Sequence, residues 1–364
     1  MGGSLLGRHL QLMTFGESHG AAMGGVLDGF PAGIPVDYAL LRQQLLRRKP
    51  MHPDFETPRH EKDEIEILSG VLDGVTLGTP IAFILRNENF KSIEYQSFKN
   101  IYRPGHADYT WDKKFGFHDN RGGGRASARE TVARVAAGTF ARMLLQQHGV
   151  LVYGFVSSLG TVTMLEDAID FSVQAIEQSA LRCPDKEVSQ RMESLLTKVA
   201  KEGDSLGGTI TCVVKNCPSG LGEPVFDKLE SALASAIMSI PAIKGVEVGA
   251  GFRSSKMKGS ELNDPFVYNE GRVVPGKNDA GGILGGISSG ADIHLRAALK
   301  PVSSIRKKQH TVDNDGAPVD LSVKGRHDVC VVPRAVPIVE AMVCLVLADM
   351  LLRQGINSHD AKYL

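Results

Sequence analysis

The sequence of 364 residues lacks an excess of charge of either sign, because 41 lysines and arginines balance 41 aspartates and glutamates. A protein that follows a nucleic-acid backbone usually carries a basic excess, so general nucleic-acid binding is disfavoured. We also find no signal peptide and no apolar run of the ~18 residues that a membrane span needs. The expectation is a cytoplasmic protein with neither nucleic acid nor membrane as a partner.

Cysteine is also scarce. The five cysteines form no CxxC pair, so neither a structural zinc site nor a disulfide framework is indicated. The sequence contains no H-E-x-x-H or other metal spacing and no G-x-G-x-x-G, which removes the usual signals for a metalloprotease and for a Rossmann dinucleotide site. We expect buried, reduced thiols and no metal.

Glycine, in contrast, is abundant, with 40 residues that gather in motif-like clusters. Apolar periodicity predicts helices over residues 37–48, 126–147, 185–202, 227–240 and 336–352. Strands are predicted over residues 10–15, 25–30, 65–68, 80–85, 151–157, 208–214, 246–252 and 293–299. The elements mix without regular βαβ alternation, which favours an α+β fold over a Rossmann or barrel design. No linker divides the chain, so one domain over residues 1–364 is expected.

The most informative segment is Arg121–Gly138, in which three glycines lead into a helix start that bears Ser127 and four arginines. Exposed backbone N–H groups, a helix N-terminus and clustered guanidinium groups all favour a bound anion. A capped surface helix with solvated arginines explains this segment alone about equally well.

Two histidines lie in glycine loops. Residues 16–20 read Gly-Glu-Ser-His-Gly, which matches the G-x-S-x-G elbow of serine hydrolases. That elbow requires a following helix, and the glycines and proline after Gly20 disfavour one. His106 follows the turn Arg103-Pro104-Gly105. Histidine titrates near neutral pH, so a paired acid–base role for His19 and His106 is indicated.

Three later segments add polar groups. Gly271–Asn278 resembles a P-loop, but it has no leading strand and Asn278 replaces the magnesium-binding hydroxyl, so we reject it. The glycine-rich run Gly281–Gly290, the segment Lys300–Ser304 and the triplet Arg326-His327-Asp328 suit phosphate and carboxylate groups. Together with the earlier loops they imply one polar pocket that holds more than one anionic group.

Two other functions stay open at this point. Ser18 could be the nucleophile of a serine hydrolase. Arg121-Gly122-Gly123 could belong to an anion- or RNA-binding module, although the zero net charge and the lack of repeated RGG units count against it.

These segments, in this order, resemble the chorismate synthase family. Gly16–Gly20, Arg121–Gly138 and Arg326–Asp328 look like its signatures, and the similarity extends from Leu6 to the last helix. The resemblance implies a 1,4-anti elimination of phosphate from 5-enolpyruvylshikimate 3-phosphate. The product is chorismate, at the seventh step of the shikimate pathway to aromatic amino acids. The reaction is redox-neutral but requires reduced FMN.

The resemblance also implies a βαβ sandwich, with helices packed between two antiparallel sheets, and a homotetramer. Bifunctional members of the family reduce their own flavin with NADPH. This sequence shows no extra segment for that task, so an external flavin reductase is expected.

By resemblance, His19 protonates the departing phosphate, His106 stabilises reduced flavin near N1 and O2, and Asp328 lies near flavin N5 and helps to accept the C6 proton. Ser18 and Ser127 support this proton network. Flavin contacts carry over to Arg125, Ala126, Ser127, Ala242, Gly285, Lys300, Pro301, Val302, Ser303, Ser304 and Arg326. Substrate-anion contacts carry over to Arg48, Arg103 and Arg129.

The sequence departs from the family pattern at two places. Asp54 stands where a second anion-binding arginine is common, and Arg59 could compensate for it. Pro241 replaces a usual flavin-contacting asparagine. Residues 50–58 contain three prolines and predict a long loop.

Overall fold

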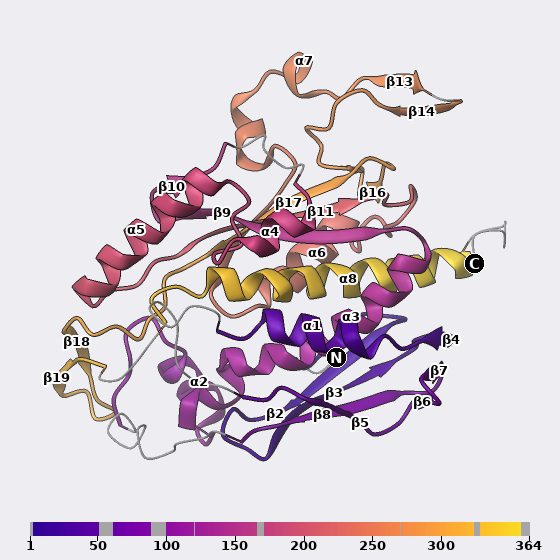
Figure 1. Ribbon diagram of the computed structural model, residues 1–364. Helices are drawn as coiled ribbons and strands as arrows, with labels where there is room; N and C mark the ends of the chain where they lie inside the picture. The colour runs from indigo at the N-terminus through magenta and orange to yellow at the C-terminus, as the bar shows by residue number, and fades with distance from the viewer. Residues whose placement is uncertain are drawn as a thin grey trace.

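Two five-stranded antiparallel sheets enclose a layer of helices in the computed structural model of the protein (Figure 1). The structure describes residues 3–50, 61–88, 100–119, 121–165, 171–269, 271–323 and 328–357. The predicted α+β class, with helices packed between two antiparallel sheets, is therefore confirmed.

The first sheet has the order β1 (Leu5–Leu6), β2 (Gln11–Gly16), β3 (Ala22–Asp28), β8 (Ile81–Arg86) and β5 (Ile65–Ile67). The second has the order β10 (Val162–Thr163), β9 (Leu151–Leu159), β11 (Gly208–Lys215), β17 (Ile293–Leu299) and β12 (Ile243–Val248). Alternating burial along β2 and β17 shows why the inner faces carry the apolar residues.

The layer between the sheets consists of α1 (Tyr38–Arg47), α3 (Thr131–Gln147), α6 (Leu229–Met238) and α8 (Val332–Asn357). Asp37 caps α1 as predicted, since its carboxylate accepts from the backbone N–H of Leu40 at 2.9 Å. Helices α3 and α8 approach at Gly138, where a Cβ would lie only 2.4 Å from the Cβ of Ala341. A larger residue at this crossing would force the two central helices apart.

The remaining elements lie around this core. The helices are α2 (Asp108–Phe115), α4 (Val173–Gln178), α5 (Lys186–Glu202) and α7 (Gly259–Leu262). The strands are β4 (Ala32–Pro35), β6 (Val71–Leu72), β7 (Val75–Leu77), β13 (Phe266–Asn269), β14 (Arg272–Pro275), β15 (Ile283–Leu284), β16 (Ile287–Ser288), β18 (Gln309–Val312) and β19 (Pro318–Leu321).

The expectation of no long apolar run was wrong for α8. Residues 332–354 are long enough to cross a membrane, and their most apolar 18-residue window has a mean hydropathy of 2.2. The helix instead fills the centre of the sandwich, with 94% of its most apolar window buried. A central core helix is apolar on every side for the same reason as a membrane span, because no side of it meets water.

Two predicted boundaries were also wrong. The helix expected from residue 126 begins at Thr131, because Gly122, Gly123 and Gly124 all take positive φ and the residues around them form short 3-10 turns. The strand expected over 246–252 ends at Val248, because Gly249 has φ +56° and turns the chain into a 3-10 turn over Gly251–Lys256.

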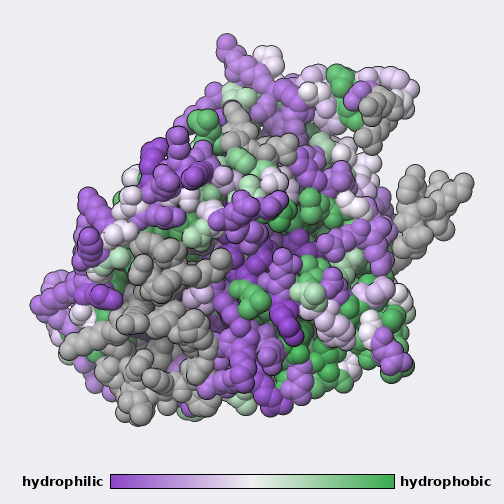
Figure 2. Space-filling view, in the orientation of Figure 1, coloured by the Kyte–Doolittle hydropathy of each residue, from purple (hydrophilic) through white to green (hydrophobic). Residues whose placement is uncertain are grey.

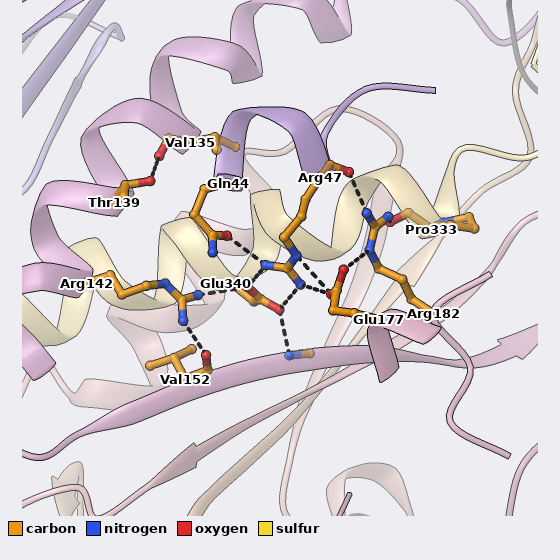
Figure 3. A network of polar contacts seen from close by, with 11 residues as sticks. Gln44, Arg47, Val135, Thr139, Arg142, Val152, Glu177, Arg182, Pro333 and Glu340 are labelled. Atoms are coloured by element: carbon orange, nitrogen blue, oxygen red, sulfur yellow. Dashed lines mark hydrogen bonds and ion pairs between the residues drawn. The ribbon is translucent and has the colours of Figure 1, made fainter. Parts of the chain in front are cut away.

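A buried ionic network joins the helical layer to the second sheet (Figure 3). Glu340 of α8 accepts from Arg47 of α1 at 2.6 and 2.9 Å and from Arg142 of α3 at 2.8 Å. It also accepts from the backbone N–H of Gly154 on β9 at 2.8 Å. Burial would raise the pKa of Glu340, but the charges of Arg47 and Arg142 hold it below its usual value.

Candidate active site

A three-glycine turn brings the two predicted histidines together. Gly122 and Gly123 have φ of +60° and +85°, which favours glycine over residues with side chains. A Cβ on Gly122 would lie 2.5 Å from Nε2 of His19. A Cβ on Gly123 would lie 3.6 Å from Nε2 of His106. Both imidazoles therefore border one stretch of backbone that has no side chains of its own.

The loop that carries His19 connects β2 to β3. Ser18 is fully buried, and its Oγ donates to the carbonyl oxygen of Arg121 at 3.1 Å. The side-chain amide of Asn87 donates to the carbonyls of Glu17 and Gly20, at 3.1 and 2.9 Å. A strand rather than a helix follows this loop, so the nucleophile elbow of a hydrolase is absent here.

His106 is held by charged neighbours. Its Nδ1 lies 2.6 Å from Oδ1 of Asp108, the first residue of α2. Arg103 donates to both carboxylate oxygens of Asp108, at 2.7 and 2.8 Å. Burial would raise the pKa of Asp108, but hydrogen bonds from Arg103 and His106 hold it far below its usual range.

The segment that starts at Lys300 lies against the His106 loop. The ammonium group of Lys300 donates to the carbonyl of Gly105, and Cβ of Ser303 lies 3.5 Å from a Cβ placed on Gly105. The backbone N–H of Lys300 donates to the carbonyl of Ala242 at 2.9 Å. Predicted flavin contacts from two distant parts of the sequence are thus joined, and the segment that starts at Lys300 lies against the loop that carries His106.

Residues 205–206, just before β11, link the stretch that carries Asp328 to the same segment. Ser205 Oγ donates to the carbonyl of Val302 at 2.7 Å, and the N–H of Leu206 donates to the carbonyl of Val329 at 2.8 Å. The Asp328 carboxylate accepts from Nη1 of Arg334 at 2.9 Å.

An arginine cluster adjoins the histidine loops. Arg48 Nη2 donates to Asp63 at 2.9 Å, and Arg129 donates to the other oxygen of the same carboxylate. Arg334 Nε donates to the carbonyl of Arg48 at 3.2 Å. Burial, followed by the nearby charges of Arg129 and Arg334, lowers the pKa of Arg48 to about 10 although Asp63 opposes this shift. The cluster has more positive charge than its carboxylates neutralise, so it favours an anion.

Comparisons with known proteins all point to one family. The sequence profile of the family described as chorismate synthase matches residues 10–352. Chorismate synthase of Archaeoglobus fulgidus is 52% identical over 351 residues, which cover 96% of this chain and 97% of that protein. Chorismate synthase of Bacteroides thetaiotaomicron is 49% identical over 343 residues, which cover 94% and 96%. A solved structure, "Crystal Structure of Chorismate Synthase", superposes with a TM-score of 0.76 at 32% identity over 96% of this chain and 93% of that one.

The chain belongs to the chorismate synthase family. It is a carbon–oxygen lyase that forms chorismate by removing phosphate from the small molecule 5-enolpyruvylshikimate 3-phosphate, in the shikimate pathway to aromatic amino acids. The serine-hydrolase and RNA-binding alternatives are therefore set aside.

The site of this chorismate synthase family member gathers most of the predicted residues. Ala126 lines a small cavity with His106 and Gly123. Ser127 caps the short turn before α3 and accepts from the N–H of Arg129 at 3.4 Å. Arg125 donates to the carbonyl of Thr14 on β2 at 2.8 Å.

Other predicted residues lie apart or cannot be placed. Gly285 is in the turn between β15 and β16, and the next residue, Gly286, lies against Lys228 at the start of α6, whereas Ala242 follows the end of that helix. A helix of this length separates the two by about 15 Å. Arg326, Asp54, Arg59 and the loop residues 51–58 lie outside the described residues.

Four residues of the site were not predicted from the sequence: Asp63, Asn87, Asp108 and Arg334. Asp108 stands two residues after His106, and this spacing was a usable signal. Asp63, Asn87 and Arg334 reach the site only through tertiary contacts, so no local pattern identifies them.

Cation binding and open grooves do not compete with this assignment. Among the described residues, no three His, Cys, Asp or Glu side chains gather where they could hold a metal ion. The five cysteines are buried and unbonded as predicted, and burial raises the pKa of Cys217 to about 12. A groove of about 700 Å³ beside α1 and α4 is lined by Tyr38, Arg42, Arg182 and neighbours, and none of the predicted site residues is among them.

Proposed function

We propose that the chain binds reduced FMN as its cofactor, beside the place where the His106 loop and the segment Lys300–Ser304 meet. The observation that carries this proposal is the convergence of His19 and His106 on the Gly122–Gly123 backbone, next to an ammonium group and hydroxyls. These donors suit the phosphate and polar ring edge of a flavin, and side-chain-free glycines allow close approach. When bound, reduced FMN supplies an electron-rich ring that assists loss of phosphate in a reaction that is redox-neutral overall.

The histidines and Asp328 divide the proton chemistry. We propose that His19, which is buried, donates a proton to the leaving phosphate, and that Ser18 and Ser127 support this proton network. His106 presents Nε2 toward the glycine turn and holds positive charge or a proton there. Asp328 helps to accept the proton from C6 of the substrate. General acid–base catalysis by positioned groups of this kind typically contributes 10²–10⁴-fold to a rate.

The arginine cluster provides the anion sites. We propose that Arg48 and Arg129 bind the substrate phosphate and carboxylates, and that Arg334 joins them through its contact with Arg48. Nε of Arg48 is buried and has no hydrogen-bond partner among the described residues, so it supports this role. Arg103 uses Nε and Nη2 for Asp108, which leaves Nη1 as the nitrogen suited to a substrate anion.

The direct test is anaerobic turnover of 5-enolpyruvylshikimate 3-phosphate, followed by chorismate absorbance and phosphate release. We expect both products with chemically reduced FMN and neither without it. His106→Ala should reduce turnover at least about 100-fold while FMN affinity changes far less, because the proposed role is electrostatic. His148→Ala, at the exposed end of α3, is the matched control. Turnover without flavin, or full turnover in His106→Ala, would contradict the proposal.

We further propose that a separate reductase supplies the reduced flavin. In the same assay, oxidised FMN with NADPH should then give no chorismate until a flavin reductase is added. Chorismate formation from NADPH and FMN alone would show instead that the chain reduces its own flavin.

We also propose a homotetramer in the cytoplasm, with residues 1–364 as one domain. One hydrophobic cluster that extends from Leu10 to Leu351 supports the single domain.

The helical layer covers only one face of the first sheet, and Met13 and Phe15 are 50% and 43% exposed on the other. Figure 2 shows a further apolar patch near β4 and β7, where Leu72 and Leu77 are exposed. Uncovered apolar faces mark interaction sites, and analytical ultracentrifugation would measure the assembly.

A further inference from the structure

We infer that Asp108 is a positioning residue for the reaction: together with Arg103 it holds His106 with a proton on Nδ1, so that Nε2 faces the reacting groups. The inference rests on the proposed role of His106. It assigns a function to a carboxylate that neither the resemblance nor the comparisons include in the site.

The contact geometry decides which imidazole nitrogen carries the proton. An ionised carboxylate can only accept hydrogen bonds, so the 2.6 Å contact between Asp108 Oδ1 and His106 Nδ1 requires a hydrogen on Nδ1. Nη2 of Arg103 lies 3.1 Å from the same nitrogen, and it is itself a donor that is already bonded to Asp108. With Nδ1 fixed as a donor, Nε2 is the nitrogen that gains or releases a proton at the Gly123 backbone.

The charge balance keeps the Asp108 carboxylate ionised. Arg103 donates to both of its oxygens, and the two side chains are only 10% and 18% exposed. A carboxylate that is held in this way orients an imidazole and stabilises its positively charged form, as in hydrolase triads. The arrangement therefore suits a histidine that supports developing negative charge on a neighbouring group.

A helix-capping role does not account for Asp108. It is the first residue of α2, and the N-cap Ala107 makes no side-chain hydrogen bond to the helix start. The carboxylate is directed to Arg103 and His106, with which it makes four hydrogen bonds, one of them from the backbone N–H of Arg103 at 3.3 Å. The helix offers an internal comparison one turn later, because Asp112 accepts from the hydroxyl of Tyr102 at 2.8 Å and touches no predicted site residue.

The first experiment measures the unsubstituted chain and uses a variant only to assign signals. Magic-angle-spinning ¹⁵N NMR of histidine-labelled protein at neutral pH, with the His106 signals assigned by their loss in His106→Ala, reports which ring nitrogens are protonated. We expect Nδ1 of His106 to carry a proton. A neutral ring protonated only on Nε2 would overturn the inference.

The second experiment compares Asp108→Asn with Asp112→Asn under reduced FMN at saturating substrate. We expect Asp108→Asn to lower kcat about 10- to 100-fold, the range typical for loss of a carboxylate that orients a metal-bound histidine, and Asp112→Asn to change it less than about 3-fold. Asp108→Asn should also shift the His106 proton from Nδ1 toward Nε2 and change the pH profile of kcat. A merely structural role would not produce either shift.

The outcomes distinguish a failure of the positioning role of Asp108 from a failure of the proposed function. If Asp108→Asn keeps the wild-type kcat while His106→Ala is inactive, the positioning role is wrong and the proposed function stands. If kcat falls but the His106 proton stays on Nδ1, the positioning role is likewise wrong. If His106→Ala is itself fully active, the proposed role of His106 fails first. If Asp108→Asn does not fold, Asp108→Glu is the second variant. We expect it to keep the proton on Nδ1 of His106 and to retain part of the wild-type kcat. A variant that retains kcat but has lost this proton would overturn the inference.

Discussion

Arg47 and Arg48 are neighbours at the end of α1, yet their guanidinium groups enter opposite electrostatic environments. Burial would lower the pKa of Arg47, but Glu340 and Glu177 raise it above its usual value. Burial and the like charges of Arg129 and Arg334 lower the pKa of Arg48 to about 10. Each arginine shares one buried carboxylate with a second arginine, Glu340 with Arg142 and Asp63 with Arg129.

The difference lies in what completes each network. Around Glu340, the guanidinium groups reach further protein acceptors: Arg142 donates to the carbonyl of Val152 at 2.6 Å, and Arg182 donates to the carbonyl of Pro333 at 2.7 Å and places Nε 3.5 Å from Glu177. Around Asp63, a third cation adjoins the pair and Nε of Arg48 is left without a partner among the described residues. A closed network stabilises the fold, whereas an incomplete one is suited to an anionic ligand.

The largest expected effect is on the closed network. Glu340→Gln leaves Arg47 and Arg142 buried without their shared charge, so the free energy of unfolding should fall by about 3–5 kcal/mol. Urea denaturation measures this change. Glu66→Gln is the control, because its partner Arg86 is an exposed cation on the first sheet and the expected change is below about 1 kcal/mol. Equal effects for the two variants would contradict the assignment of Glu340.

Asp63→Asn should have an intermediate effect that a ligand reverses. Asp63 has φ +51°, a region that asparagine tolerates, so the loss of charge is the main change. We expect a loss of about 2–4 kcal/mol of unfolding free energy. Phosphate at about ten times its Kd should restore about 1.4 kcal/mol. Glu340→Gln should gain no more from phosphate than the wild type does, and an equal gain in both variants would remove the contrast between the two networks.

The smallest expected effect is on how the free energy of unfolding falls at acid pH. The pKa of Glu340 and the pKa of Asp63 are both lowered by folding. Their contribution to the free energy of unfolding is therefore complete above the carboxyl pKa values of the unfolded chain, near pH 4–4.5. It is lost as the pH falls further. Each such carboxylate should steepen the fall by about 1.4 kcal/mol per pH unit in that window. The slope should decrease in Glu340→Gln, as measured by urea denaturation between pH 5 and pH 3; an unchanged slope would contradict the lowered pKa of Glu340.

Much of this comparison is invisible in the sequence. Local patterns predicted α1, β17 and the histidine loops, because periodicity, caps and glycine turns are written in neighbouring residues. The family resemblance, rather than a local pattern, added Arg48 as a substrate-binding residue. Local patterns could not separate Arg47 from Arg48, since the partners Glu340 and Asp63 are supplied by α8 and by the segment before β5. Long-range pairing of this kind depends on the packed fold rather than on any local signal.

Helix α8 also misled the sequence analysis for a physical reason. An uninterrupted apolar run is the usual signal of such a helix, and apolar periodicity predicts a helix only from residue 336. The helix starts at Val332, and Pro333, Pro337 and Glu340 interrupt the pattern without stopping it. Pro333 lies in the first turn, where proline is tolerated. Pro337 lies inside the helix and cannot donate to the carbonyl of Pro333, which accepts from Nη1 of Arg182 at 2.7 Å instead. Glu340 is neutralised by its arginines.

The position of α8 has a consequence for synthesis. Every strand of both large sheets precedes Val332 in the chain, while α8 is the helix on which both halves of the sandwich pack. During translation the second sheet therefore emerges before the helix that covers β9 and β11, whereas α3, which packs on the first sheet, is already made. A ribosome that pauses before this segment holds a nascent chain that is suited to chaperones, and release of the last helix allows the halves to close.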